Sequence, residues 1–342
     1  MPRTILRWLL RALALGAFLL AGMVGLFLFG GWREGRDLSA LLHAPSVPPL
    51  GPKVVLAAGP LGAAQRVGEL ANRELVEASG LAASRLRDDV LWVHNDHSPR
   101  PVIFAAGLDG SDRGSFEIEG ATVEDWEDLA SFELDGKPYL LVADVGDNAG
   151  WRRDVTLYVV AEPVFDGPRL APGTRVPLAW TTRLRYPDGS RDCESVAVDM
   201  QREKVLLLSK RAEPKTLYEV PLRPASTALL VATRLGPMPQ LPRATQADVD
   251  ANAAMGGFAG QPTSMDLLPD GSALVVLTYR DLLLFPRRGD ESWATAAARL
   301  PQGLMHPPML QAEAVAFARD GASVFLTGEQ RPTPLYRVPF SH

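Results

Sequence analysis

The feature that most constrains the fold of this chain is a fivefold repeat of short apolar segments. Each repeat holds three runs rich in Val, Leu, Ile and Tyr, and the first reads GLAAS, VLWVHND and VIFAAGL. Turn sequences such as LDGSD, LDGK and PDGS separate the runs. Short runs between turn signals are typical of β-strands, and no convincing amphipathic helix of ordinary length accompanies them. The sequence therefore predicts an all-β fold of repeated units.

The spacing of the repeats predicts a closed ring. Four triplets leave room for a fourth strand, near Phe116 and at TRLRYP, VATRLG and AARLPQ. The fifth has none, because the chain ends at His342, but the strand-like segment at residues 65–75 is free to supply its outer strand. Pairing the first and last segments leaves no unpaired sheet edge. We expect a five-bladed β-propeller; six blades stay open because residues 238–261, interpreted as a long loop over one face, are unassigned.

The N-terminus carries an apolar run long enough to cross a membrane. Residues 12–31 are 20 uncharged residues, and a helix of that length spans about the 30 Å of a hydrocarbon core. A cleaved signal peptide usually has a shorter apolar region of about 7 to 15 residues. We therefore expect an uncleaved transmembrane helix. Three unopposed arginines precede the run, whereas acids match those after it, so the body is expected outside the cytoplasm.

These observations divide the chain into three parts. We expect a single-pass bacterial inner-membrane anchor at residues 1–36, a Pro- and Gly-rich linker at 37–63, and a periplasmic propeller at 64–342. Without residues 1–37 the chain has 30 basic and 38 acidic residues, a formal charge of −8. This charge argues against general nucleic-acid binding. The single cysteine, Cys193, permits no intramolecular disulfide, so the fold must depend on its core.

Acidic residues recur at the start of the innermost strands. We aligned these strands on one apolar position each: Leu81, Leu129, Val196, Met265 and Val315. Two residues earlier stand Ser79, Glu127, Glu194, Thr263 and Glu313, and four residues earlier stand Glu77, Asp125, Asp192, Gln261 and Gln311. A period of two places both columns on one side of their strands. Because innermost strands line the channel of a propeller, these side chains should meet around its axis.

Such a convergence of carboxylates predicts a metal site. The candidate ligands are Glu77, Asp125, Glu127, Asp192, Glu194 and Glu313. Without a cation these acids would repel one another and raise their own pKa values. Ca²⁺ accepts about six to eight oxygen ligands in flexible geometry, so it is the expected cofactor. The alternative is that the acids pair with arginines or cap turns between blades.

The loops after the second strands should open on the same end of the channel, because neighbouring strands run antiparallel. They offer ligand-binding candidates: Asn95, Asp144, Asp147, Asn148, Tyr279, Arg280 and Glu329. They also offer catalytic candidates: Asp96, His94, Lys210 and Arg211. A bound cation beside fixed cations suits an anionic ligand such as a phosphate. The alternatives are that the basic residues pair with the acids, and that the histidines of HNDHS are structural.

Four segments carry a resemblance to known proteins. EASGLA with LWVHND, DWEDLA with ADVGDN, YPDGSRDCESVAVD and EAVAF resemble an uncharacterised group of bacterial secreted or membrane-anchored propeller proteins. This resemblance spans most of residues 75–340. More distantly, a glutamate at the start of each blade and charged loops after the second strands are similar in layout to calcium-activated apyrases and regucalcin-like lactonases.

The distant resemblance implies a metal in the channel. The apyrases imply five blades, a central Ca²⁺ and hydrolysis of nucleotide phosphoanhydrides, whereas the lactonases imply six blades around a metal. By position, Glu77, Glu127, Glu194 and Glu313 match the kind of residue used in those channels, and Lys210 with Arg211 matches basic residues of the apyrases. The fourth blade departs from the pattern, since it offers only Thr263 and Gln261.

Two classes of function stay open. One is a metal-dependent hydrolase acting on an anionic, phosphorylated substrate or on a lactone or ester. The other is a non-catalytic envelope protein that holds a partner on a propeller face around a structural ion. An open pocket joining the carboxylates to Lys210 and Arg211 would favour the hydrolase. A mouth filled by residues 238–261 would favour the binding protein.

Overall fold

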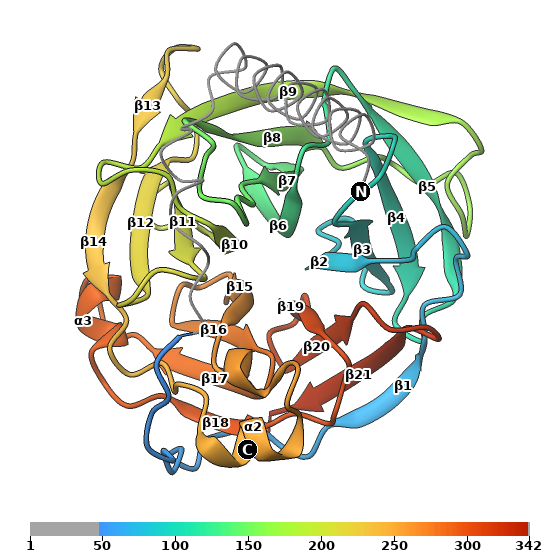
Figure 1. Ribbon diagram of the computed structural model, residues 1–342. Helices are drawn as coiled ribbons and strands as arrows, with labels where there is room; N and C mark the ends of the chain where they lie inside the picture. The colour runs from blue at the N-terminus through green and yellow to red at the C-terminus, as the bar shows by residue number, and fades with distance from the viewer. Residues whose placement is uncertain (1–47, 341–342) are drawn as a thin grey trace, which may run out of the picture.

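The computed structural model describes residues 48–340, which form an all-β ring with the arrangement of a β-propeller (Figure 1). The innermost strands contact one another in a closed circle. In order around the ring they are β2 (Ala78–Ala83), β6 (Trp126–Leu134), β10 (Cys193–Asp199), β15 (Pro262–Leu267) and β19 (Ala312–Phe317). The expectation of an all-β, propeller-like fold is confirmed.

Each innermost strand begins a four-stranded antiparallel blade. The first blade continues with β3 (Val90–Asn95), β4 (Val102–Gly107) and β5 (Asp112–Glu119), the second with β7 (Lys137–Asp144), β8 (Val155–Ala161) and β9 (Thr174–Arg185). The third continues with β11 (Lys204–Ser209), β12 (Thr216–Pro221) and β14 (Thr233–Pro237), the fourth with β16 (Ala273–Thr278), β17 (Asp281–Pro286) and β18 (Gln302–Met305). The fifth holds β20 (Ser323–Gly328), β21 (Pro334–Pro339) and β1 (Gln65–Glu69).

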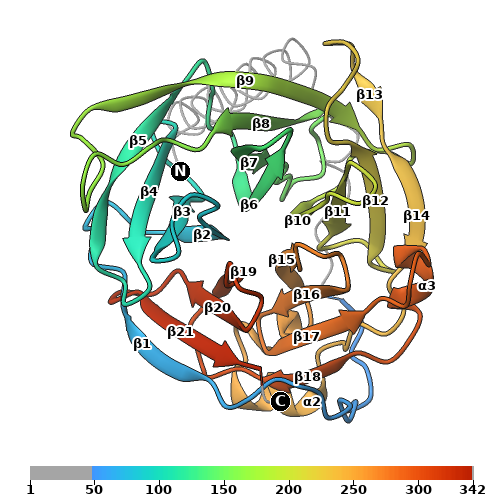
Figure 2. The same ribbon diagram turned by 180° about the vertical axis from the view of Figure 1, so that it is seen from behind.

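The ring closes through its first and last strands. β1 pairs antiparallel with β21, so a segment from the beginning of the described chain completes the blade formed by its end. Figure 2 shows this contact from behind, with the blue β1 beside the red β21. The pairing gives the fifth blade the outer strand that residues 65–75 were expected to supply. It also covers an edge that would otherwise expose unpaired N–H and C=O groups.

The outer strands differ from the expectation at two places. β9 is long, and its first residues pair in parallel with β5, so the first and second blades form one continuous sheet. The short β13 (Leu230–Val231) then pairs in parallel with the end of β9. In the fourth blade, helix α3 (Trp293–Ala297) takes up part of the stretch expected as the outer strand, which instead begins at Gln302.

The N-terminal part of the chain bears on three predictions. The predicted anchor at residues 1–36, and the predicted linker as far as residue 47, lie outside the described residues. Within residues 48–340, no helix is long and apolar enough to span a membrane. The rest of the predicted linker touches the ring, because Ala57 forms a bridge to Gln302 and Leu61 to Phe340.

Residues 238–261 lie over the fourth blade on one face of the ring. This segment contains α2 (Gln246–Ala251) and η2 (Gly256–Phe258), and α2 lies in front of β17 and β18 in Figure 1. An ion pair between Asp248 and Arg280 joins α2 to the loop after β16. The expected long loop over one face is therefore a partly helical insertion tied to the mouth of the channel.

The core lies between neighbouring blades. One apolar cluster contains Trp92 and Phe116 of the first blade together with Trp126 and Leu129 of the second. All four side chains are fully buried. Trp126 and Leu129 therefore pack between blades, as the position of DWEDLA at a strand start suggests, which directs the neighbouring acids toward the channel.

Candidate metal centre

The innermost strands share a β-bulge at the same height. Against each second strand one residue has no partner, and these residues are Gly80, Glu127, Glu194, Thr263 and Glu313. A bulge leaves its extra residue unpaired and re-aims its side chain. Three of the five blades therefore present a glutamate from an irregular backbone position at the start of the innermost strand.

The first blade corrects the sequence alignment by one residue. Its bulge is Gly80, so Ser79 is not the counterpart of Glu127. Gly80 has a φ of +54°, which favours glycine, and a Cβ at this position would overlap the His94 ring. The first blade thus offers no side chain at the height where three others offer a carboxylate.

Three carboxylates come together in the interior. Oxygens of Glu127, Asp192 and Glu194 lie within 4.8 Å of one another, and the three residues are only 5%, 6% and 3% exposed. Asp192 accepts hydrogen bonds from the Asp147 N–H at 2.9 Å and from Arg211 Nε at 2.5 Å. Glu194 accepts from Lys210 Nζ. This buried carboxylate cluster has the donor set to hold a metal ion.

Glu127 is the least satisfied member of the cluster. Within residues 48–340 its carboxylate accepts no hydrogen bond and forms no ion pair, although the residue is only 5% exposed. A buried, unpaired carboxylate is costly. Gly146 lets two carboxylates lie close together, because a Cβ on this residue would overlap Glu127 Oε1 and lie 2.5 Å from Asp125 Oδ2. Oxygens of both carboxylates thus lie against the Gly146 backbone, and a cation between them would satisfy both.

Further acids surround this cluster at the channel mouth. Burial raises the pKa of Asp96 to about 9, with further contributions from Asp125, Glu329, Glu313 and Glu77. Burial also raises the pKa of Glu329 to about 7, followed by Glu313 and Glu77. These mutual effects show that acids from the first, second and fifth blades lie close together.

The basic residues of the third blade are already paired with acids. Lys210 Nζ contacts Glu194 and donates to Tyr279 Oη at 2.8 Å. Tyr279 in turn donates to Glu313 Oε1 at 2.9 Å. Burial would lower the pKa of Lys210, but the carboxylates, Glu194 foremost, raise it well above its usual value. Lys210 is therefore a buried ammonium ion that offsets one carboxylate charge.

Several other predicted ligand-binding residues form hydrogen bonds and ion pairs with groups of the protein itself. Asn95 accepts from the Val76 and Glu77 N–H groups, and Asp144 accepts from the Glu124 and Asp125 N–H groups. The remaining contacts of this kind join Asp147 to the Trp151 and Arg152 N–H groups, Asn148 to Arg211, and Arg280 to Asp281 and Asp248. These side chains fix the loops that carry the carboxylates.

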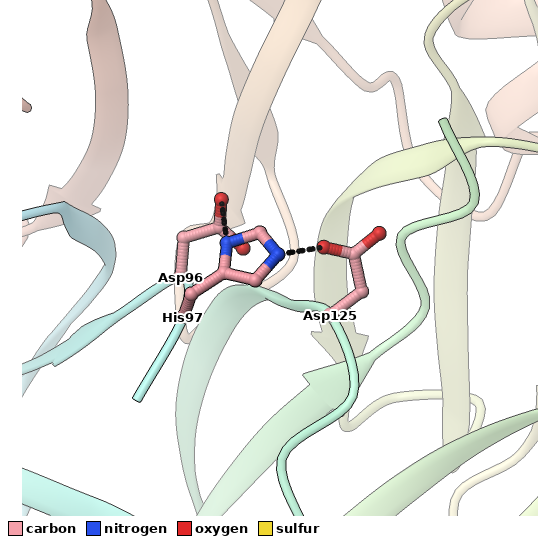
Figure 3. Close-up of side chains that lie close together, drawn as sticks. All are labelled: Asp96, His97 and Asp125. Carbon is pink, nitrogen blue, oxygen red and sulfur yellow. Dashed lines mark ion pairs between the residues drawn. The ribbon is translucent and has the colours of Figure 1, made fainter. Parts of the chain in front are cut away.

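His94 and His97 differ from the expectation. His94, the proposed base, is fully buried, stacks edge-on against Trp126, and has its pKa lowered to about 4 by burial. It therefore lies in the core. His97 instead lies at the mouth between Asp96 and Asp125 (Figure 3). Both histidines belong to HNDHS, where strand alternation turns the residue inside β3 inward and leaves the loop residue outside.

Arg152 is a residue of the site that the sequence patterns did not single out. Its side chain is buried, pairs with Asp144 at 2.9 Å and donates to the Gly146 carbonyl at 2.8 Å. It thereby holds the loop whose Gly146 lies against Glu127. The only signal in the sequence is its place in WRRD, two residues after the acidic loop VGDN.

Comparisons with known proteins concern the fold alone. No family model and no curated protein matches the chain. Among solved structures, the chain is distantly similar to a luciferin-regenerating enzyme (8% identity, 81% of this chain and 94% of that one, TM-score 0.41). A gluconolactonase of Xanthomonas campestris is similarly distant (13% identity, 86% of this chain and 99% of that one, TM-score 0.43). So is a PQQ-bound aldose sugar dehydrogenase of Streptomyces coelicolor (14% identity, 83% of this chain and 99% of that one, TM-score 0.43).

The raised pKa values predict that the metal-free protein loses stability as pH rises. In the folded protein the pKa of Asp96 is about 9 and that of Glu329 is about 7. In the unfolded chain the corresponding pKa values are 3.8 and 4.5. The unfolded state thus binds fewer protons between these limits, and stability falls by up to about 1.4 kcal/mol per pH unit per group. Chemical denaturation in chelator at pH 5, 7 and 9 should show this decline. A flat or rising profile would contradict it.

Proposed function

We propose that this propeller binds Ca²⁺ in the cluster of Glu127, Asp192 and Glu194 and uses it to hydrolyse an anionic, phosphorylated substrate at the channel mouth. The observation that carries the proposal is the carboxylate of Glu127, which is buried and has no partner among residues 48–340. The three ligands are all carboxylates, and hard oxygen donors suit Ca²⁺ better than the softer transition metals. Asp125, whose carboxylate lies against Gly146 as that of Glu127 does, is the fourth candidate ligand.

The residues around the cluster have distinct parts in this proposal. The Asp147 N–H and Arg211 hold Asp192 in place, and Lys210 limits the negative charge on Glu194. The Arg211 side chain is 32% exposed, so it is the cluster-bound cation that a phosphate can reach from solvent. A bound Ca²⁺ would supply Lewis-acid polarisation of a phosphoryl or carbonyl oxygen.

A non-catalytic propeller with a structural ion is the second candidate. The low exposure of Glu127, Asp192 and Glu194 favours it, because closed sites without an open ligand position are typical of structural metals. Under this alternative the face around the mouth would hold an envelope partner. A lactone or ester substrate remains the other hydrolytic alternative.

An activity screen distinguishes these alternatives. We expect the purified full chain to hydrolyse phosphoesters, and not lactones, only when Ca²⁺ is present. Arg211→Gln should lower kcat/KM for the phosphoester by about a hundredfold, the usual loss on removal of one charge-stabilising donor. Arg223→Gln is the matched control, since the Arg223 side chain is 64% exposed and, among the acids of residues 48–340, pairs only with Asp135. Calcium binding without hydrolysis of either class would contradict the enzyme proposal and support the structural ion.

A further inference from the structure

The His97 ring lies between two carboxylates at the mouth of the channel (Figure 3). Its Nδ1 atom is 2.9 Å from Asp96 Oδ2, and its Nε2 atom is 3.3 Å from Asp125 Oδ1. The His97 side chain is 61% exposed, whereas those of Asp96 and Asp125 are 20% and 13% exposed. A solvent-exposed imidazole thus lies against two carboxylates that are mostly buried.

The hydrogen bonding of this group is incomplete. A neutral imidazole has one N–H donor, and its other nitrogen accepts a hydrogen bond or binds a metal. Within residues 48–340, Asp125 Oδ1 is buried and has no hydrogen-bond partner, although His97 Nε2 lies 3.3 Å away. In addition, Asp96 Oδ1 is buried and has no hydrogen-bond partner within residues 48–340. The group as a whole lacks positive charge and donors.

The two distances suggest different partners for the two nitrogens. The 2.9 Å separation of Nδ1 from Asp96 is that of an ordinary hydrogen bond. The 3.3 Å separation of Nε2 from Asp125 is long for a charged hydrogen bond. It matches two ligands of a tetrahedral Zn²⁺, which at about 2.0 to 2.2 Å from the metal lie roughly 3.3 to 3.5 Å apart. A carboxylate behind a ligating histidine is also a common orienting arrangement.

We propose that His97 Nε2 and Asp125 Oδ1 bind a second cation of the Zn²⁺ type, with Asp96 accepting the Nδ1–H and fixing the ring. Mixed nitrogen and oxygen ligands suit Zn²⁺, whereas the buried cluster offers oxygens alone. Asp125 connects the two sites, because its Oδ2 atom and Glu127 Oε1 both lie against Gly146. The exposed side of His97 leaves the remaining coordination positions open to water or substrate. Only the link to the calcium cluster through Asp125 rests on the proposed function.

Binding of Co²⁺, a spectroscopic substitute for Zn²⁺, tests the proposal. We expect the full chain in excess Ca²⁺ to bind one Co²⁺ with the visible absorption of a four-coordinate site. His97→Gln should abolish this spectrum, and Asp96→Asn should weaken binding by about 10- to 100-fold, as loss of an orienting partner usually does. Glu124→Gln is the control, because Glu124 is a half-exposed acid of the same loop. Calorimetric titration with Zn²⁺ should rank the affinities of the parent and the variants in the same order.

The same variants separate this proposal from the calcium proposal. Glu127→Gln should lose the Ca²⁺ response and keep the Co²⁺ spectrum, whereas His97→Gln should do the reverse. Unchanged Co²⁺ binding by His97→Gln would overturn the second site, whatever the outcome for Ca²⁺. Displacement of Co²⁺ by Ca²⁺ in direct competition would overturn it too, because it would show one shared site. Melting of each variant in chelator checks that the fold is intact.

Discussion

Replacing Asp128 with alanine is expected to destabilise the protein by at least about 3 kcal/mol, the largest effect of any single substitution near the channel. Asp128 is fully buried beside Glu127. Its Oδ2 atom accepts from the Val196 N–H at 2.8 Å and the Met265 N–H at 3.2 Å. Its Oδ1 atom accepts from the Leu129 N–H at 3.0 Å and the Ser264 hydroxyl at 2.9 Å.

The reason for this effect is that innermost strands of different blades share no hydrogen-bonded ladder. Backbone N–H groups that face the channel need another acceptor, and one carboxylate serves the second, third and fourth blades. Alanine would leave three buried N–H groups without partners, at a cost of about 1 to 3 kcal/mol each. Denaturant unfolding in chelator measures the loss.

Asp88→Ala is the matched control for this substitution. The Asp88 side chain is 91% exposed and pairs with Arg319 at the surface, so its loss should change stability by less than about 0.5 kcal/mol. Asp128→Asn should lie between the two, because the amide retains one acceptor oxygen. Equal midpoints for Asp128→Ala and Asp88→Ala would show that the blades do not depend on this carboxylate.

The fold was predictable from the sequence because its signals are local and repeated. Alternating apolar runs and turn sequences indicate each strand, and the count of runs indicates that residues 65–75 pair with the last blade. The parallel pairing of β5 with β9 was not predictable in this way. It depends on one long strand that crosses between two blades, and a strand pattern carries no information about its neighbours.

The alignment of the innermost strands was predictable except in the first blade. A period of two places Glu127, Glu194 and Glu313 at equivalent positions, as the structure does, but it assumes regular strands. The bulges break that regularity, and in the first blade the bulge falls on Gly80, which shifts the alignment. Bulge positions depend on the pairing with the second strand, so they are visible only in the folded sheet.

The roles of the charged loop residues were the least predictable. Lys210 was expected at an open mouth, yet it is buried against Glu194 and Tyr279. His94 and His97 are three residues apart, and only the end of β3 between them decides which one lies in the core. Such choices depend on side-chain packing among blades that are far apart in the sequence.

Calcium-dependent melting of Glu127→Gln and Glu124→Gln tests whether the buried carboxylate cluster binds Ca²⁺. A ligand at a hundredfold excess over its dissociation constant stabilises the folded state by about 2.7 kcal/mol. Ca²⁺ should therefore raise the melting temperature of the parent by about 2 to 4 °C, and chelator should reverse the change.

The two variants each remove one charge and differ in position. Glu127→Gln neutralises a buried carboxylate that has no partner in the part of the chain that the structure describes, so most of the calcium response should disappear. The Glu124 side chain is 50% exposed and 3.5 Å from Arg152, so Glu124→Gln should keep the response of the parent. We expect a calcium-dependent rise in melting temperature for the parent and Glu124→Gln but not for Glu127→Gln. Equal responses in the two variants, or none in the parent, would show that Glu127 does not bind Ca²⁺.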